Sequence, residues 1–246
     1  MRFRKLFTLV AIATVLLSTS ALLADDDEAP PRWKQRFHLN MSGSSGNTRD
    51  FELNTGWRAR KETERHRHRL DASYLYGEAE NVRTKTAATA GALNDWLVPN
   101  ATWFAFAKLR YDFDDFKAWT HRANSHAGLG EQLLKTENAE ILGRLGLGAS
   151  KQWEPTDDLQ PEGLLGLDGE WSINEQQSFI ASSYLYPYLD DWPEYRLISN
   201  AEYNIQLDQA RGINMHAGIE HEYESSVGTE TRNWDLRYYA GISISF

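Results

Sequence analysis

The candidates for catalytic chemistry in this sequence are a serine and two histidines in one short segment. His121, Ser125 and His126 flank Asn124, and a serine beside a histidine base is a common hydrolytic arrangement. In a β-strand, however, successive side chains point to opposite faces. Ser125 then shares a face with His121 and not with His126, and a dyad with His126 requires a bulge. We therefore predict no catalytic residues and no enzyme activity.

A second candidate group is acidic and follows one strand-like segment. His216, Glu220, Glu222 and Glu224 are all at even positions, and carboxylates are ligands that hard cations favour. Alternate side chains of one strand are about 6–7 Å apart, so one ion would need further ligands from neighbouring strands. We expect these side chains to form ion pairs with Arg196 or Arg237 inside the fold instead, and we expect no metal site or cofactor. The candidate lumen charges are Arg196, Glu202, His216, Glu220, Glu222 and Arg237.

A third group is basic and lies in a predicted turn. Arg65, Arg67 and Arg69 alternate with His66 and His68. Such a cluster could contact an anion, such as a lipopolysaccharide phosphate, or it could be a solvated hairpin tip. The sequence leaves both interpretations open.

The N-terminal residues have the organisation of a secretory signal. Arg2, Arg4 and Lys5 precede an apolar run over residues 6–17, which is short for a membrane-spanning helix of about 20 residues. Cleavage is expected between Ala21 and Ala24. We assign 1–24 to the signal peptide, 25–32 to a flexible lead-in and 33–246 to the folded domain.

Composition excludes several functions. The 246 residues include no cysteine, which excludes disulfides, thiolate metal sites and a lipoprotein anchor. The formal net charge is −9, and removing three basic signal residues makes it −9 − 3 = −12. Nucleic-acid binding needs a basic surface, so no nucleic-acid partner is expected.

The elements that carry these residues have a period of two. About twelve segments of roughly 10 residues alternate apolar with polar side chains, the length of a tilted transmembrane strand. Short turns at 135–138 and 208–212 alternate with longer loops at 77–83, 154–163 and 188–194. Aromatic residues lie near many strand ends, where interfacial girdles form: Trp33, Trp57, Trp103, Phe113, Trp119, Trp153, Tyr188, Trp192, Tyr195, Tyr223 and Trp234. The pattern predicts an all-β fold, a transmembrane antiparallel up-and-down β-barrel of about 12 strands. A soluble periplasmic barrel is the alternative fold.

The last segment resembles the signal by which the outer-membrane assembly machinery recognises its clients. Such strands alternate hydrophobic residues and end in an aromatic residue, as in Tyr238, Ala240, Ile242, Ile244 and Phe246. The resemblance implies that periplasmic chaperones and this machinery are partners.

The body of the chain also resembles one family, the YdiY-type salt-induced outer membrane proteins, barrels described as a domain of unknown function. The likeness is carried by SGSSGNT at 42–48, by WFAFAKLRYDFD at 103–114 with Arg122 and GLG at 128–130 after it, and by LGLG at 145–148. The family implies a fold and a place in the bacterial outer membrane, beside lipid and lipopolysaccharide. It implies no catalytic residues.

From these observations we expect a non-enzymatic barrel that serves as a small channel or stabilises the envelope. A link to osmotic or salt stress comes from the family's name alone. The glutamates of the 213–224 segment would favour cations if the lumen conducts. The alternative is an outer-membrane enzyme that acts on lipid or on a surface polymer.

Overall fold

The structure is a computed structural model that describes residues 32–44, 50–117, 119–154, 157–225 and 233–246. The described residues form twelve strands. The first six are β1 (Lys34–Ser44), β2 (Asp50–Glu62), β3 (His66–Ala79), β4 (Val82–Leu97), β5 (Trp103–Asp114) and β6 (His121–Lys135). The others are β7 (Ala139–Trp153), β8 (Asp158–Ser172), β9 (Gln177–Pro187), β10 (Tyr195–Asp208), β11 (Ile213–Glu224) and β12 (Trp234–Ser245). The predicted signal peptide at 1–24, the lead-in as far as residue 31 and residues 45–48 of the SGSSGNT motif lie outside the described residues.

Each strand pairs antiparallel with its neighbours in sequence, and β12 pairs with β1 to close the barrel. The prediction of a closed antiparallel up-and-down barrel of about twelve strands is therefore confirmed. Across the described ranges, no helix is long and apolar enough to span a membrane.

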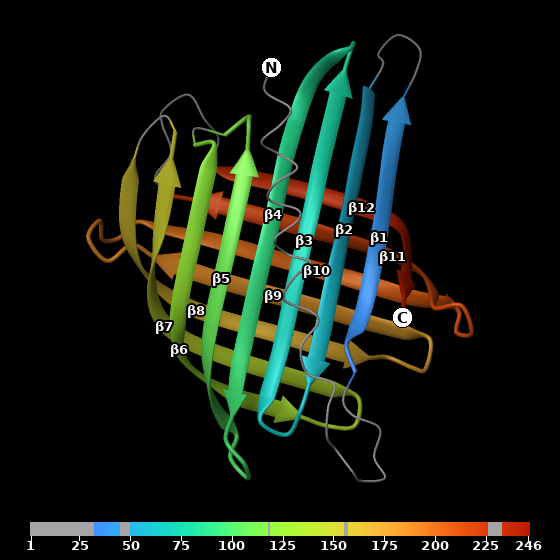
Figure 1. The fold of residues 1–246 in the computed structure, drawn as a ribbon, viewed down its shortest axis with the longest axis vertical. Coiled ribbons are helices and arrows are strands. Elements are labelled where there is room, and N and C mark those ends of the chain that lie inside the picture. The colour runs from blue at the N-terminus through green and yellow to red at the C-terminus, as the bar shows by residue number, and fades with distance from the viewer. Residues whose placement is uncertain (1–31, 45–49, 118, 155–156, 226–232) are drawn as a thin grey trace, which may run out of the picture. The chain divides into compact units, whose positions relative to one another are not determined.

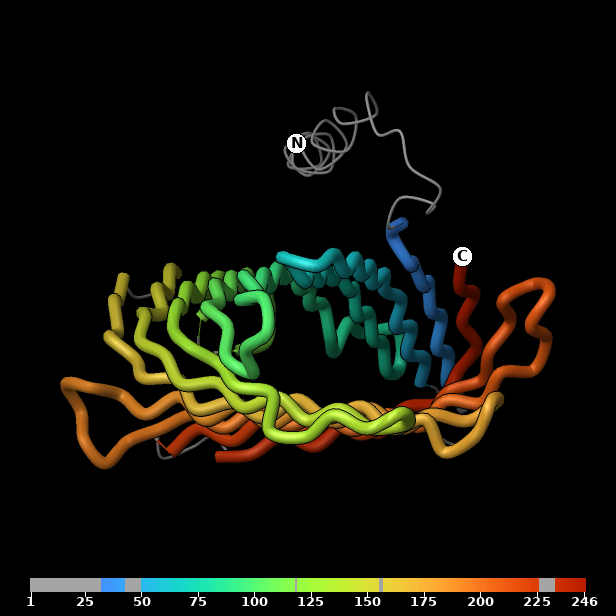
Figure 2. The backbone as a smooth tube through the Cα atoms, turned by 90° about the horizontal axis from the view of Figure 1, so that it is seen from below, coloured from blue at the N-terminus to red at the C-terminus, as the bar shows by residue number. Residues whose placement is uncertain are grey.

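The barrel residues form two walls that face each other. In Figure 1, β1 to β5 run side by side along the near side, and β9 to β12 cross behind them. Figure 2 shows the same two walls edge-on, with β6 to β8 in the curved end that joins them. Because the walls lie close together, side chains of one can reach side chains of the other across the lumen.

The period of two separates an apolar exterior from a polar interior. Leu145 and Leu147 of β7 point outward and are 64% and 66% exposed, while Arg144 between the barrel walls is buried. Trp234, Leu236, Tyr238, Ile242 and Ile244 of β12 are all exposed on the outside as well. An apolar exterior of this kind is stable against lipid. A closed barrel is also suited to lipid because it leaves few backbone groups unpaired.

Two loop predictions are wrong. The loop expected at 77–83 is a two-residue turn, because Glu80 and Asn81 have positive φ angles of 51° and 62° and continue the hairpin directly. The loop expected at 154–163 ends where β8 begins at Asp158. Pro161 lies in β8, paired with Ala149 of β7, before the strand begins to pair with β9 at Leu165. Its missing N–H therefore interrupts no β8–β9 ladder.

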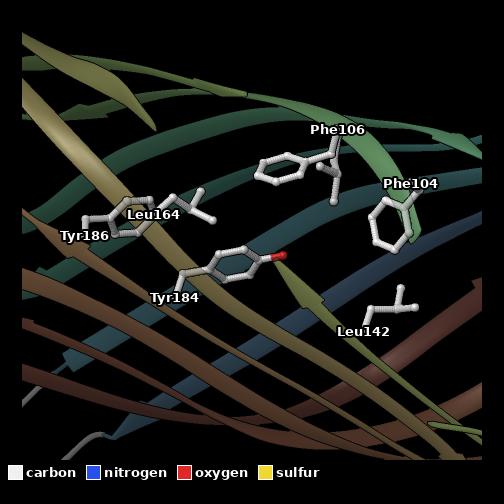
Figure 3. Packing of buried hydrophobic residues seen from close by; sticks show 7 residues of the cluster. Phe104, Phe106, Leu142, Leu164, Tyr184 and Tyr186 are labelled. Carbon is white, nitrogen blue, oxygen red and sulfur yellow. The ribbon is translucent and has the colours of Figure 1, made fainter. Parts of the chain in front are cut away.

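Glycines of β6 and β7 make room for two aromatic rings inside the barrel. A Cβ on Gly130 would lie 2.4 Å from the Phe104 ring, and one on Gly146 would lie 2.9 Å from the Phe106 ring. Phe104 and Phe106 belong to a buried cluster that fills one part of the lumen (Figure 3), with Leu93, Leu142, Leu164, Tyr184 and Tyr186. The glycine motifs of the sequence therefore have a packing role.

The closing seam is short. β1 and β12 share only the register from Arg36↔Ser245 to Leu39↔Ile242, while β11 and β12 pair from Ile213↔Ile244 to Tyr223↔Trp234. Phe246 extends the seam, because its N–H donates to the Gln35 carbonyl at 2.9 Å and its carbonyl accepts from the Gln35 N–H at 2.8 Å.

Candidate functional site: the charged lumen

The structure places all six candidate lumen charges on the inner face. They come from the alternate positions of β10, β11 and β12 that oppose the outward apolar row: Arg196, Glu202, His216, Glu220, Glu222 and Arg237. Their partners come from both neighbouring and distant strands, as follows.

Glu220 and Glu222 are joined to cations in two different ways. Arg237 of the adjacent strand donates to Glu220. The Glu222 carboxylate forms an ion pair with Lys117 of the β5–β6 loop, and the guanidinium of Arg122 on β6 lies 3.5 Å from the same carboxylate. Of the two partners expected for the acidic residues of β11, Arg237 pairs with Glu220, whereas Arg196 pairs with Glu162 of β8 instead.

Arg196, Glu202 and His216 have partners that sequence proximity could not indicate. Arg196 donates to Asn124 at 2.8 Å and to Glu162 at 3.2 Å. The carboxylate of Glu202 accepts from Arg36 at 2.7 Å and from Tyr239 at 3.0 Å. His216 lies 2.9 Å from the side-chain oxygen of Asn40 on β1. These contacts join strands that are more than 30 residues apart in the chain.

A buried ion-pair cluster lies beside the aromatic residues of the lumen. Arg144 donates to Asp95 at 2.7 and 3.1 Å and to Asp168 at 2.9 Å. The Tyr184 hydroxyl donates to Asp168 at 2.6 Å. The Arg144 guanidinium also lies 4.9 Å from the centre of the Phe104 ring. Buried charges are tolerated only when they are paired and hydrogen-bonded, so separating these side chains is costly. The cluster therefore keeps this part of the lumen filled.

A cavity of about 660 Å³ occupies the rest of the lumen. Ten acidic and eight basic side chains line it, a difference of two negative charges, and the two signs are separated. The basic wall consists of lining residues from β2 to β5: Arg58, Arg60, Arg69, Lys85, Lys108 and Arg110, with the acids Asp71, Asp112 and Asp114 among them. The acidic wall consists of lining residues from β7 to β12: Glu140, Asp168, Glu170, Glu202, Glu220, Glu222 and Asp235, with the base Arg237. The eighth base, Lys117 of the β5–β6 loop, lies against Glu222 and Asp235 of this wall.

Ion pairs connect the basic wall to the acidic wall. Arg60 of β2 lies 2.6 Å from Glu170 of β8, and Arg69 of β3 lies 3.3 Å from Asp168 of β8. Arg58 is 3.8 Å from its acidic neighbour Glu202. The cavity is therefore crossed by charged side chains whose tips meet, and its free width is set by them.

The candidate catalytic segment separates as strand parity predicts. Ser125 is exposed on the outer face, while His126 is buried in the lumen with its Nε2 3.1 Å from Glu162. Among the described residues, no group of three or more histidines and carboxylates is arranged to hold a metal ion.

The basic turn at 65–69 is not a patch of free cations. Arg67 lies 3.4 Å from Asp95 and from Glu140, and Arg69 faces the lumen as a member of the basic wall. The five residues therefore do not share one exposed surface, because Arg67 and Arg69 turn inward to acidic partners while Arg65 is exposed.

Two residues assigned to the aromatic girdle are also lumen residues. Trp119 is buried under the guanidinium of Arg122, which lies 4.1 Å from its ring centre, and buried Tyr188 donates to Glu224 at 2.9 Å. No signal in the sequence distinguishes these contacts, since an aromatic ring near a strand end suits either environment.

The fold and the lumen together define the class, an outer-membrane-type antiparallel β-barrel with a charged interior. The sequence pattern of one family matches residues 38–246, and the chain therefore belongs to that family, described as protein of unknown function, DUF481.

No curated protein matches the sequence. Among solved structures, the NanC porin is similar at 12% identity and a TM-score of 0.48, over 86% of this chain and 98% of that one. An outer membrane channel from Pseudomonas putida F1 is similar at 9% identity and a TM-score of 0.49, over 92% and 100%. The translocator domain of the autotransporter NalP from Neisseria meningitidis is similar at 12% identity and a TM-score of 0.47, over 98% and 94%.

Proposed function

We propose that this protein is a non-enzymatic barrel of the bacterial outer membrane that lets small polar solutes pass through its lumen. The observation that carries the proposal is the cavity of about 660 Å³ lined by both signs of charge. Charged walls replace part of the hydration of a polar solute, whereas a packed apolar core would exclude it. The exposed position of Ser125 away from His126 supports a role other than hydrolysis.

The contacts across the lumen support a narrow channel. Arg60–Glu170 and Arg69–Asp168 must separate, or lie beside the path, for a solute to pass. We therefore expect a small unit conductance that rises when these contacts are removed. The excess of two acidic side chains in the lining supports the cation preference predicted from the β11 glutamates.

Planar-bilayer recording of the purified, folded protein tests the proposal. The expected result is small, discrete current steps for the wild type, with larger steps for an Arg60→Gln variant. A reversal-potential measurement on the wild type should show a preference for cations over anions. No steps above background in the wild-type protein or in Arg60→Gln would reject conduction. That result would favour the second role, stabilising the envelope, which the buried Arg144 cluster supports.

The location and partners belong to the same proposal. The outward apolar side chains, including the β12 row and Phe246, support insertion into the outer membrane by its assembly machinery after periplasmic transport with chaperones. Lipid and lipopolysaccharide would then contact the exterior. Cell fractionation tests the location, with recovery in detergent-extracted outer membrane expected. The link to osmotic or salt stress rests on the family resemblance, and measurement of protein levels after a salt shift tests it.

A further inference from the structure

The separation of charge across the lumen bears on which solutes could pass. The lining acids and bases almost balance in number, yet six of the eight bases lie on the basic wall and seven of the ten acids lie on the acidic wall. A field therefore runs across the pore, from the basic wall to the acidic wall, perpendicular to the direction of transport. A lumen with mixed charges would select by net charge, whereas this arrangement acts on a solute that carries both signs.

We propose that the lumen favours small zwitterionic solutes, those with an ammonium and a carboxylate group in one molecule. This inference rests on the proposed channel function and names its substrate class. A zwitterion aligned across the pore places its carboxylate toward the basic wall and its ammonium toward the acidic wall.

The ion pairs between the walls explain why such a solute enters. Arg60 and Glu170 touch across the lumen and are only partly buried, with 33% and 45% of their side chains exposed. A zwitterion between them exchanges one ion pair for two. A neutral solute of equal size separates the same charges and offers no charge in return, and a simple anion or cation meets one wall of its own sign.

Arg58 and Glu220 provide one test residue on each wall. Arg58 is 27% exposed and its ion pair with Glu202 is long, at 3.8 Å, so a solute carboxylate can compete for it. Glu220 is 41% exposed beside Arg237. Neither belongs to the buried Arg144 cluster, so both can be neutralised while that cluster stays intact.

The experiment is osmotic swelling of liposomes containing the full folded barrel, with alanine and its neutral isomer lactamide as the probes. Rates in protein-free liposomes are subtracted. We expect the alanine-to-lactamide ratio to fall by about two- to fivefold in Arg58→Gln and also in Glu220→Gln, the range that a partly exposed ion pair supports. Arg211→Gln removes a charge that is 78% exposed in the β10–β11 turn, and it should leave the ratio unchanged.

Two outcomes overturn the inference while leaving the channel in place. In the first, lactamide enters and the ratio is equal in all three variants and the wild type, which is the result for selection by net charge, because both isomers are uncharged overall. In the second, the two lumen variants shift the ratio in opposite directions, so the two walls do not act together on one zwitterion. If neither isomer enters faster than in protein-free liposomes, the proposed channel itself fails. Folding of each variant is checked by heat-modifiable gel migration, so a lost signal is not confused with a lost barrel.

Discussion

Arg144 is the residue whose removal should destabilise the barrel most clearly. Its side chain is 0% exposed, and its partners Asp95 and Asp168 are 1% and 9% exposed. Replacing it by methionine keeps much of the volume but leaves two carboxylates short of a cation. Removal of one partner from a buried ion pair costs about 3–5 kcal/mol of unfolding free energy.

The retained contacts place Arg144→Met at the lower end of that range. Asp95 still has Arg67 at 3.4 Å, and Asp168 still has Arg69 at 3.3 Å and the Tyr184 hydroxyl at 2.6 Å. We therefore expect a loss of about 3 kcal/mol. The control is Arg60→Met, which breaks a partly exposed pair and should cost about 0–1 kcal/mol.

Equilibrium urea unfolding in detergent micelles, followed by the fluorescence of the nine tryptophans, measures both variants. Adding Asp95→Asn to Arg144→Met should recover part of the loss, because the uncompensated carboxylate is gone. The reasoning is refuted if Arg144→Met costs no more than Arg60→Met, or if the Asp95→Asn change simply adds its own cost to the double variant.

Three further predictions concern packing, closure and pH. Gly130→Val should cost about 1–3 kcal/mol by overpacking against the Phe104 ring, whereas Gly169→Ala, where a Cβ meets only a carbonyl at 4.0 Å, should be neutral in the same urea titration. Deleting Phe246 removes two backbone hydrogen bonds of the short β1–β12 seam, each worth about 1 kcal/mol of stability. The fraction of protein in the heat-modifiable, folded form should therefore decrease on gels. An unchanged folded fraction would contradict both the closing role of Phe246 and its part in the assembly signal. Burial lowers the pKa of Lys117, but attraction by Glu222 and Asp235 outweighs it, so the net shift is upward. Because the pKa is raised, the stability from the Lys117 ion pairs is fully present below the ordinary lysine pKa and is lost only as pH rises through the raised pKa. Unfolding free energy in urea should therefore show no Lys117-dependent change between pH 6 and pH 9. Comparison of the wild type with Lys117→Gln at each pH checks this.

The strand pattern and its faces were predictable from the sequence. Alternation at a period of two is a local property, so the outward row from Trp234 to Phe246 and the inward position of Glu220 and Arg237 follow from counting along one strand. The loop errors at 77–83 and 154–163 arose where a local signal was misleading. Gly77 lies at a register shift within the β3–β4 hairpin, and Pro161 lies in β8, where it pairs with Ala149 of β7 before the pairing with β9 begins.

Which charges meet, and on which wall, was decided by the tertiary structure alone. Arg60 and Glu170 are 110 residues apart, and only closure of the barrel, with one wall crossing the other, brings them to 2.6 Å. The same closure buries Arg144 among aromatic rings and turns Arg67 and Arg69 inward. Parity along a strand gives the face of each side chain, but the partner across the lumen depends on barrel size, strand tilt and wall spacing, which are properties of the whole sheet.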